Sequence, residues 1–252
     1  MVALYLIGLP ILLSIVFNGA TALQPRFVGS SVVSISDYPY QLSIYFGRND
    51  VCGAVIIAPK WAITAASCLD FKKPSMINLR AGSNETQFGG TVYQVSNFLI
   101  HPKYNGSTAD HGVALLNLTK PFVYGKNVRP VPLISANRIV SVGTNAVITG
   151  WGYVTNSGPA FSRTLRRLIM SVLDPSACSN EYGKAFNRNT MMCTQNVVNK
   201  KGLCSGAGYP MVVNGTLAGV YITGRGCTNS APIFVKLSAP STRSWISSIA
   251  RV

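Results

Sequence analysis

Few side chains in this chain are suited to acid–base chemistry, because it has only two histidines, His101 and His111. Hydrolysis by an activated nucleophile needs a hydroxyl or thiol, an imidazole and a carboxylate that orients the imidazole. His101 lies in the turn-rich sequence HPKYN, where we expect an exposed structural histidine. Strand alternation points His111 away from the face that Asp110 and Gly112 share. Asp110 could then pair with Ser67, but a carboxylate and a hydroxyl without an imidazole make a poor hydrolase.

Three short segments carry more information about chemistry. Residues 61–68 read WAITAASC, residues 112–116 read GVALL and residues 204–210 read CSGAGYP. They resemble the motifs W-[VI]-[LIV]-T-A-A-H-C, D-I-A-L-L and C-x-G-D-S-G-G-P of the chymotrypsin-like serine proteases. The resemblance puts Ser67 where these proteases have the catalytic histidine, and Gly112 where they have the aspartate.

The third segment is one residue shorter than the family motif. Counting back from Pro210 puts Ala207 at the nucleophile position, and counting from Cys204 puts Gly208 there. The positions of a degenerate triad would be Ser67, Gly112 and Ala207. A hydroxyl, an imidazole and a carboxylate are needed together. We therefore expect that the chain is not an enzyme.

The segment that would bind substrate also departs from the family pattern. Residues 219–227 read GVYITGRGC, where the family has G-I-V-S-W-G-x-G-C. By resemblance, Gly202 replaces the residue that selects the substrate side chain, and Ile233 replaces a glycine that keeps the pocket open. A branched side chain there should fill the space. The positions of this expected occluded pocket are Gly202, Tyr221, Ile222, Thr223, Gly224 and Ile233.

The N-terminal sequence predicts export. Residues 1–22 contain a short apolar run followed by an A-x-A-like cleavage site, which is typical of a signal peptide, and we expect no membrane anchor. Residues 23–26 then resemble a vestigial pro-segment, with cleavage between Arg26 and Phe27. A buried ammonium at Phe27 would meet Gly206 or Ala207 instead of a carboxylate, so we expect cleavage to activate nothing.

Six cysteines in an exported chain favour three disulfides over a metal site, and fifteen pairings are open from the sequence. The resemblance selects Cys52–Cys68, Cys178–Cys193 and Cys204–Cys227. We expect no cofactor and no metal. N-x-[ST] sequons, each a possible glycan site or an unmodified surface residue, begin at Asn84, Asn105, Asn117 and Asn214.

Short apolar or alternating runs, separated by Gly, Pro and Asn, predict an all-β fold. The expected strands are 40–46, 52–57, 62–65, 91–100, 113–118, 145–149, 165–172, 210–213, 216–222 and 232–237. The resemblance implies two six-stranded Greek-key β-barrels, residues 27–135 and 136–237, with the cleft between them. Residues 238–252 form a C-terminal segment in which the helical spacing of Trp245, Ile246 and Ile249 predicts a short helix over 241–252.

The charge is strongly unbalanced, with 22 Lys plus Arg against 7 Asp plus Glu. Basic residues cluster at 72–73, at 163 with 166–167, and at 200–201. This balance suits either solubility alone or attraction to acidic partners such as glycosaminoglycans and acidic proteins. Export and the lack of a binding motif argue against nucleic acid as a partner.

Among chymotrypsin-like proteins, the chain most resembles the inactivated serine protease paralogues of the scabies mite. That resemblance implies a secreted protein that faces the host, binds complement proteins and blocks their cascade in immune evasion. A basic glycosaminoglycan-binding module is the alternative. A decoy that captures protease inhibitors would need an open cleft, which Ile233 and Tyr221 argue against.

Overall fold

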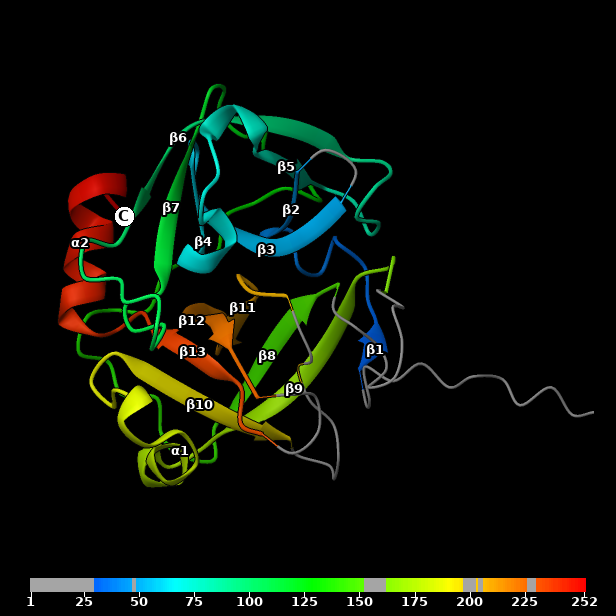
Figure 1. The fold of residues 1–252 in the computed structure, drawn as a ribbon. Coiled ribbons are helices and arrows are strands. Elements are labelled where there is room, and N and C mark those ends of the chain that lie inside the picture. The colour runs from blue at the N-terminus through cyan, green and yellow to red at the C-terminus, as the bar shows by residue number, and fades with distance from the viewer. Residues whose placement is uncertain (1–29, 47–48, 152–161, 197–202, 204–205, 226–229) are drawn as a thin grey trace, which may run out of the picture.

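The first half of the chain forms a closed antiparallel barrel. We describe a computed structural model for residues 30–46, 49–151, 162–196, 203, 206–225 and 230–252. The barrel has the strand order β2-β3-β4-β7-β6-β5, seen in the upper part of Figure 1. Its strands are β2 (Gln41–Phe46), β3 (Asn49–Ala58), β4 (Trp61–Ala65), β5 (Asn78–Ala81), β6 (Thr91–Ile100) and β7 (Val113–Leu118).

The second half forms another antiparallel barrel below the first in Figure 1. Its sheet has the order β1-β9-β10-β13-β12-β11-β8, and a further pairing of β8 with β9 closes it. The strands are β8 (Asn145–Gly150), β9 (Arg166–Val172), β10 (Met191–Asn196), β11 (Pro210–Val213), β12 (Thr216–Thr223) and β13 (Ile233–Lys236). The early strand β1 (Ser31–Val32) crosses over to pair with β9.

Helices are short and lie outside the barrels. The longest is α2 (Pro240–Ala250), beside β6 and β7 in Figure 1, and the others are α1 (Pro175–Tyr182), η1 (Ala66–Leu69), η2 (Pro74–Met76) and η3 (Gly183–Ala185). The expected all-β fold of two six-stranded barrels with a C-terminal helix is confirmed. No helix in the described ranges is long and apolar enough to cross a membrane. The expected signal peptide and the Arg26–Phe27 cleavage site lie outside the described residues.

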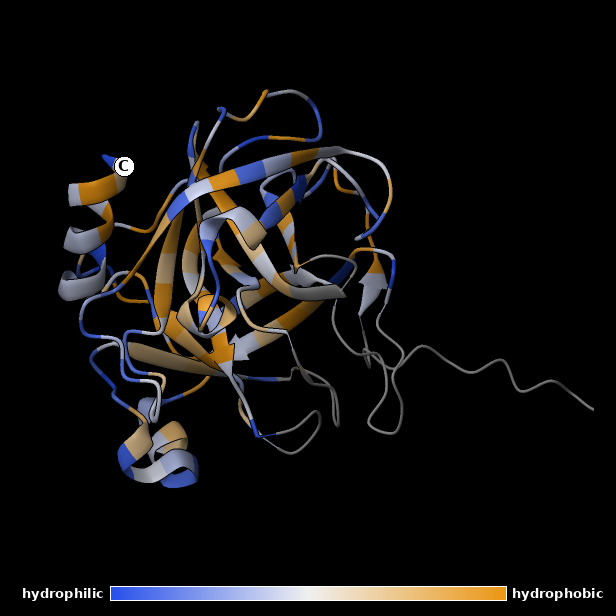
Figure 2. Cartoon of the chain, turned by 45° about the horizontal axis from the view of Figure 1, so that its top comes forward, coloured by the Kyte–Doolittle hydropathy of each residue, from blue (hydrophilic) through white to orange (hydrophobic). Residues whose placement is uncertain are grey.

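The core follows from strand alternation. In β9, Arg166, Leu168, Met170 and Val172 are buried on one face, and the residues between them are more exposed. Hydrophobic residues occur along the strands of both barrels (Figure 2), and β11 is buried over its whole length. A buried hydrogen bond of 2.7 Å from Thr149 Oγ1 in β8 to Gln41 Oε1 in β2 joins the two barrels. The two barrels therefore share one packed interior, which fixes the positions of the loops between them.

Candidate functional site

Ser67 is exposed on the 3₁₀ helix η1, directly after β4. Two contacts hold this segment. The Ala66 amide donates to the Gly112 carbonyl at 2.9 Å, and a disulfide joins Cys68 to Cys52 in β3. The structure therefore brings positions 67 and 112 close together, as the resemblance implies.

Gly112 has no space for a side chain. A Cβ atom at this position would lie 2.6 Å from the Ala109 carbonyl oxygen and 3.3 Å from Cγ2 of Ile222. The first contact is with backbone, so it cannot be relieved by a rotamer change. Ile222 is buried. The side chain that lies next to Gly112 is therefore a buried apolar one, at the position where the resemblance implies a carboxylate.

Two expectations about neighbouring residues are wrong. Asp110 does not pair with Ser67, because its carboxylate accepts hydrogen bonds from Thr190 Oγ1 and Asn187 Nδ2 instead. Strand alternation does not apply to His111 either. β7 begins at Val113, and His111 has a positive φ of 50°. The side chain of His111 is therefore directed by a tight turn and not by a strand.

His101 is also placed differently from our expectation. It is 3% exposed, not a surface residue. Its ring stacks on His111, with centroids 4.6 Å apart, and meets the edge of Trp245 in α2 at 4.8 Å. Burial lowers the pKa of His101, so its ring is neutral near pH 7. The expectation failed because α2, which covers His101, is more than a hundred residues away in sequence.

The segment around Ala207 is held tightly against the first barrel. The Gly53 amide donates to the Ala207 carbonyl at 2.8 Å, and the Gly208 amide donates to the Tyr221 carbonyl at 2.8 Å. Gly208 has a positive φ of 86°, and a Cβ atom there would lie 2.0 Å from the Gly53 carbonyl oxygen. Only glycine fits at position 208. Ala207 itself is half-buried and carries a methyl group.

Tyr209 is an important residue of this region that our sequence reasoning missed. Its side chain is buried, and its hydroxyl donates to the Trp151 carbonyl at 2.8 Å. A Cβ atom added at Gly53, Gly150 or Gly206 would lie within 2.6 Å of this ring. Glycines from three distant segments thus make the space that Tyr209 fills. An aromatic residue in an otherwise small segment was the one available signal.

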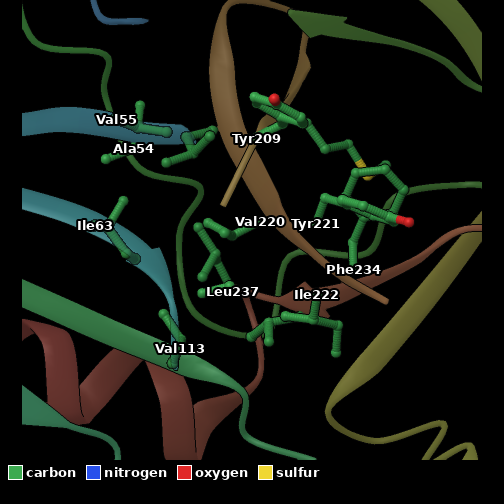
Figure 3. Packing of buried hydrophobic residues seen from close by; sticks show 14 of the residues in the cluster. Ala54, Val55, Ile63, Val113, Tyr209, Val220, Tyr221, Ile222, Phe234 and Leu237 are labelled. Carbon is green, nitrogen blue, oxygen red and sulfur yellow. The ribbon is translucent and has the colours of Figure 1, made fainter. Parts of the chain in front are cut away.

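Two of the expected pocket residues, Tyr221 and Ile222, lie in the packed interior (Figure 3). Tyr221, Ile222 and Ile233 are buried, and the rings of Tyr221 and Phe234 are 5.6 Å apart. Burial raises the pKa of Tyr221, which keeps its phenol neutral. Thr223 and Gly224 are half-buried, and Gly202 lies outside the described residues. Occlusion of a substrate pocket by these residues stays a prediction.

A hollow of about 220 Å³ nevertheless remains beside Ile233. Its lining includes Thr223, Arg225, Tyr182, Met191 and the segment 106–109. The Arg225 guanidinium lies over the Tyr182 ring at 4.9 Å and donates to the Glu181 carbonyl at 3.0 Å. This hollow therefore has a cationic rim.

Two of the three expected disulfides and all four sequon asparagines lie within the described residues. The structure contains the disulfides Cys52–Cys68 and Cys178–Cys193, and Cys204 and Cys227 lie outside the described residues. The sequon residues Asn84, Asn105 and Asn214 are exposed, and Asn117 is half-buried, so glycosylation stays a prediction for all four. Within the described ranges, no group of three His, Cys, Asp or Glu residues could hold a metal.

The residues of the basic clusters differ in their exposure to solvent, which the sequence does not indicate. Arg166 is buried, donates to Ser30 Oγ at 2.9 Å and has a pKa lowered by burial, whereas Arg163 is exposed. Lys200 and Lys201 lie outside the described residues. Among the side chains that the structure describes, the one close contact between a basic and an acidic group joins His111 Nδ1 to Asp110 Oδ1 at 3.2 Å. The exposed lysines and arginines there are thus not neutralised by described carboxylates.

Two closed antiparallel six-stranded barrels with a C-terminal helix define a chymotrypsin-like fold. The chain belongs to the trypsin family, because the family model named Trypsin matches residues 27–246. Trypsin alpha of Drosophila melanogaster is 32% identical over 231 residues, which cover 90% of this chain and 89% of that protein. Hypodermin-B of Hypoderma lineatum is 33% identical over 233 residues, covering 91% and 89%. A solved structure of neuropsin, a serine protease expressed in the limbic system of mouse brain, superposes with a TM-score of 0.79. It has 26% identity, and the match covers 88% of this chain and 99% of that one.

These comparisons contradict our expectation that the chain is not an enzyme. The matching family is that of trypsin, and the relatives are named as trypsins and proteases, so the findings point to a protease. The side chains at positions 67, 112 and 207 are those of Ser, Gly and Ala. An imidazole and a carboxylate for acid–base chemistry would have to come from elsewhere in the chain.

Proposed function

We propose that this trypsin-family chain is a secreted binding protein that antagonises host complement, as implied by its resemblance to the scabies mite paralogue group. The observation that carries the proposal is the apolar filling around Gly112. Ile222 packs against Gly112 and is buried, as are Tyr221 and Ile233. Contacts with a large partner would then be made by loops on the outer surface of the barrels, which the packed interior holds in place.

The surface charge supports an acidic partner. The chain carries 22 basic and 7 acidic residues, and no described Lys or Arg is paired with a described carboxylate. Unpaired positive charge raises the rate at which a negatively charged protein surface is captured. This argument supports binding to an acidic surface in general, and the resemblance selects complement.

The test is complement-mediated lysis of antibody-sensitised red cells with the purified, disulfide-bonded chain added. Dose-dependent inhibition by the folded chain is expected. A heat-denatured sample and an unrelated protein of similar positive charge are the controls, because charge alone can disturb the assay. Equal inhibition by the charged control, or no inhibition, would contradict the proposal.

An acidic glycan is the second candidate partner, and one structural detail favours it. The Leu118 amide donates to the Lys60 carbonyl, and the Phe122 amide donates to the Pro59 carbonyl. These bonds set the exposed Lys60 next to the chain segment of the exposed Lys120. Two neighbouring cations without acidic partners suit the repeating anionic groups of a glycosaminoglycan.

A further inference from the structure

A serine, a histidine and an aspartate, at positions other than 67, 112 and 207, lie close together in the structure. Ser241 Oγ lies 3.1 Å from His111 Nε2, and His111 Nδ1 lies 3.2 Å from Asp110 Oδ1. Ser241 is the second residue of α2, and the other two precede β7, which α2 accompanies in Figure 1. The Ser241 hydroxyl thus lies within hydrogen-bond distance of one ring nitrogen of His111 and the Asp110 carboxylate lies beside the other, which is the order of groups in a serine hydrolase.

The carboxylate of this group is held in place by three donors. Asp110 Oδ1 accepts from Thr190 Oγ1 at 2.5 Å and from the His111 amide at 2.8 Å, and Oδ2 accepts from Asn187 Nδ2 at 2.9 Å. Burial alone would raise the pKa of Asp110. The hydrogen bonds and His111 outweigh it, so the pKa lies below the usual value. Asp110 is therefore ionised at neutral pH and cannot rotate freely.

The position of Asp110 selects the tautomer of His111. A carboxylate beside Nδ1 favours the form with its proton on Nδ1, which leaves Nε2 free to accept the proton of the Ser241 hydroxyl. His101 stacks on the same ring, and its Nε2 lies 3.4 Å from the Ser241 carbonyl. Because burial lowers the pKa of His101, its ring places no positive charge beside His111.

The reacting oxygen lies at the start of a helix. α2 is 11 residues long and has no side-chain cap at its N-terminus. Within the described part of the chain, no acceptor is recorded for the amides of Ser241 and Thr242. Free amides and the positive end of the helix dipole stabilise an oxyanion. Ser241 is half-buried and the Asp110 side chain is 21% exposed, so the group borders the surface.

We propose that Ser241, His111 and Asp110 form a hydrolytic site for small carboxylic esters. Ser241 Oγ bonds to the acyl carbon while its proton moves to His111 Nε2. The ester C–O bond breaks, and the departing alcohol oxygen takes that proton. A water oxygen then bonds to the acyl carbon and gives a proton to His111. The Oγ–C bond breaks, and Ser241 Oγ takes that proton back from His111. Asp110 positions His111 throughout.

The experiment uses the purified, disulfide-bonded chain with p-nitrophenyl acetate and, separately, with a fluorophosphonate. The released p-nitrophenol gives the rate, and peptide mass mapping locates the phosphonylated residue. Ser241→Ala should reduce the rate above background at least tenfold and abolish labelling. Ser248→Ala, on the exposed side of the same helix, is the matched control and should match the wild type.

Two outcomes would overturn the proposal. One is labelling of the wild-type chain at a residue other than Ser241, which does not depend on the folding of any variant. The other is an equal rate for wild type and Ser241→Ala. Asp110→Asn should lower the rate of ester hydrolysis and should slow, but not abolish, the labelling of Ser241. If Asp110 had a purely structural role, the labelling rate of the folded fraction would be unchanged.

Discussion

Among single residues, Tyr209 has the largest effect on the structure around positions 206–208. Its ring occupies space that Gly53, Gly150 and Gly206 leave open, and its hydroxyl reaches the Trp151 carbonyl. Strand β3 of the first barrel, strand β8 of the second and the segment of Gly206 therefore pack around one aromatic side chain. The short segment that contains Ala207 is constrained in the same region, because the backbone of Gly208 lies directly against the Gly53 carbonyl.

We predict that Tyr209→Phe lowers the free energy of unfolding by about 1–3 kcal/mol, because the buried Trp151 carbonyl loses a donor. Urea unfolding of the two proteins measures the change. Tyr124→Phe is the control, since Tyr124 is 42% exposed and its substitution should change stability by less than about 0.5 kcal/mol. A Tyr209→Phe variant as stable as the wild type would contradict the role assigned to this hydroxyl.

Residue identities at aligned motif positions could be read from the sequence, but their surroundings could not. Ser67 and Gly112 are visible as substitutions within short motifs. The packing of Ile222 on Gly112 joins β12 to the turn before β7, and the burial of His101 depends on α2. Both contacts join segments more than a hundred residues apart, so local patterns contain no sign of them.

At the level of elements, the turn before β7 is the most constrained. Ala109 and His111 both have positive φ, near 59° and 50°, which is uncommon for residues with a Cβ atom. Hydrogen bonds to Asp110 from Asn187 and Thr190, together with the His111–Ser241 contact, hold the turn against two other segments. The strained turn is thus held by two hydrogen bonds to the Asp110 carboxylate and by the contact between His111 and Ser241.

We predict that the stabilising effect of Asp110 is lost in acid. Its folded pKa lies below the ordinary value of 3.8, so the ionised group stabilises the fold above that value and loses this effect as the pH falls through the folded pKa. The difference in unfolding free energy between wild type and Asp110→Asn should be constant near neutrality and shrink below about pH 4.

Chemical unfolding at a series of pH values measures this difference. Asp37→Asn, at an exposed aspartate, controls for the loss of one negative charge. A gap between wild type and Asp110→Asn that stays unchanged down to pH 2 would contradict the prediction.

The sequence predicted the strands that read as longer apolar or alternating runs, and it missed β1, β5 and β10. β6 and β7 have the expected bounds, whereas β5 (NLRA) is short and β10 (MMCTQN) contains a single β-branched residue. α1 was also missed, although Asp174 caps it and Pro175 is its first residue, a recognised start signal. β5 and β10 are strands because neighbouring strands pair with them on both sides.

At the scale of the whole molecule, positive charge is the dominant property. Lys and Arg outnumber Asp and Glu by 22 to 7, and the described exposed cations have no carboxylate partners within the described residues. Such a surface attracts anions over roughly a Debye length, about 10 Å at 0.1 M salt and about 3 Å at 1 M. Association that depends on this charge must therefore weaken with salt.

We predict that the chain binds immobilised heparin and that Lys60→Ala with Lys120→Ala lowers the NaCl concentration needed for elution. The two side chains project from adjoining segments, so their removal opens a gap in the positive surface. Lys103→Ala with Lys184→Ala removes the same charge elsewhere and should have a smaller effect. Equal shifts for both double variants would show that only net charge matters.

The pairing of β1 with β9 has a consequence for the order of folding. Ser31 and Val32 lie opposite Arg167 and Arg166, so the second barrel includes a strand from the beginning of the chain. Closing a loop of that length costs more conformational entropy than pairing neighbouring strands, so this contact forms late. During synthesis, residues 31–32 leave the ribosome before the first barrel, yet must wait for β9 to emerge. The earliest described strand to be made is thus among the last to find its place.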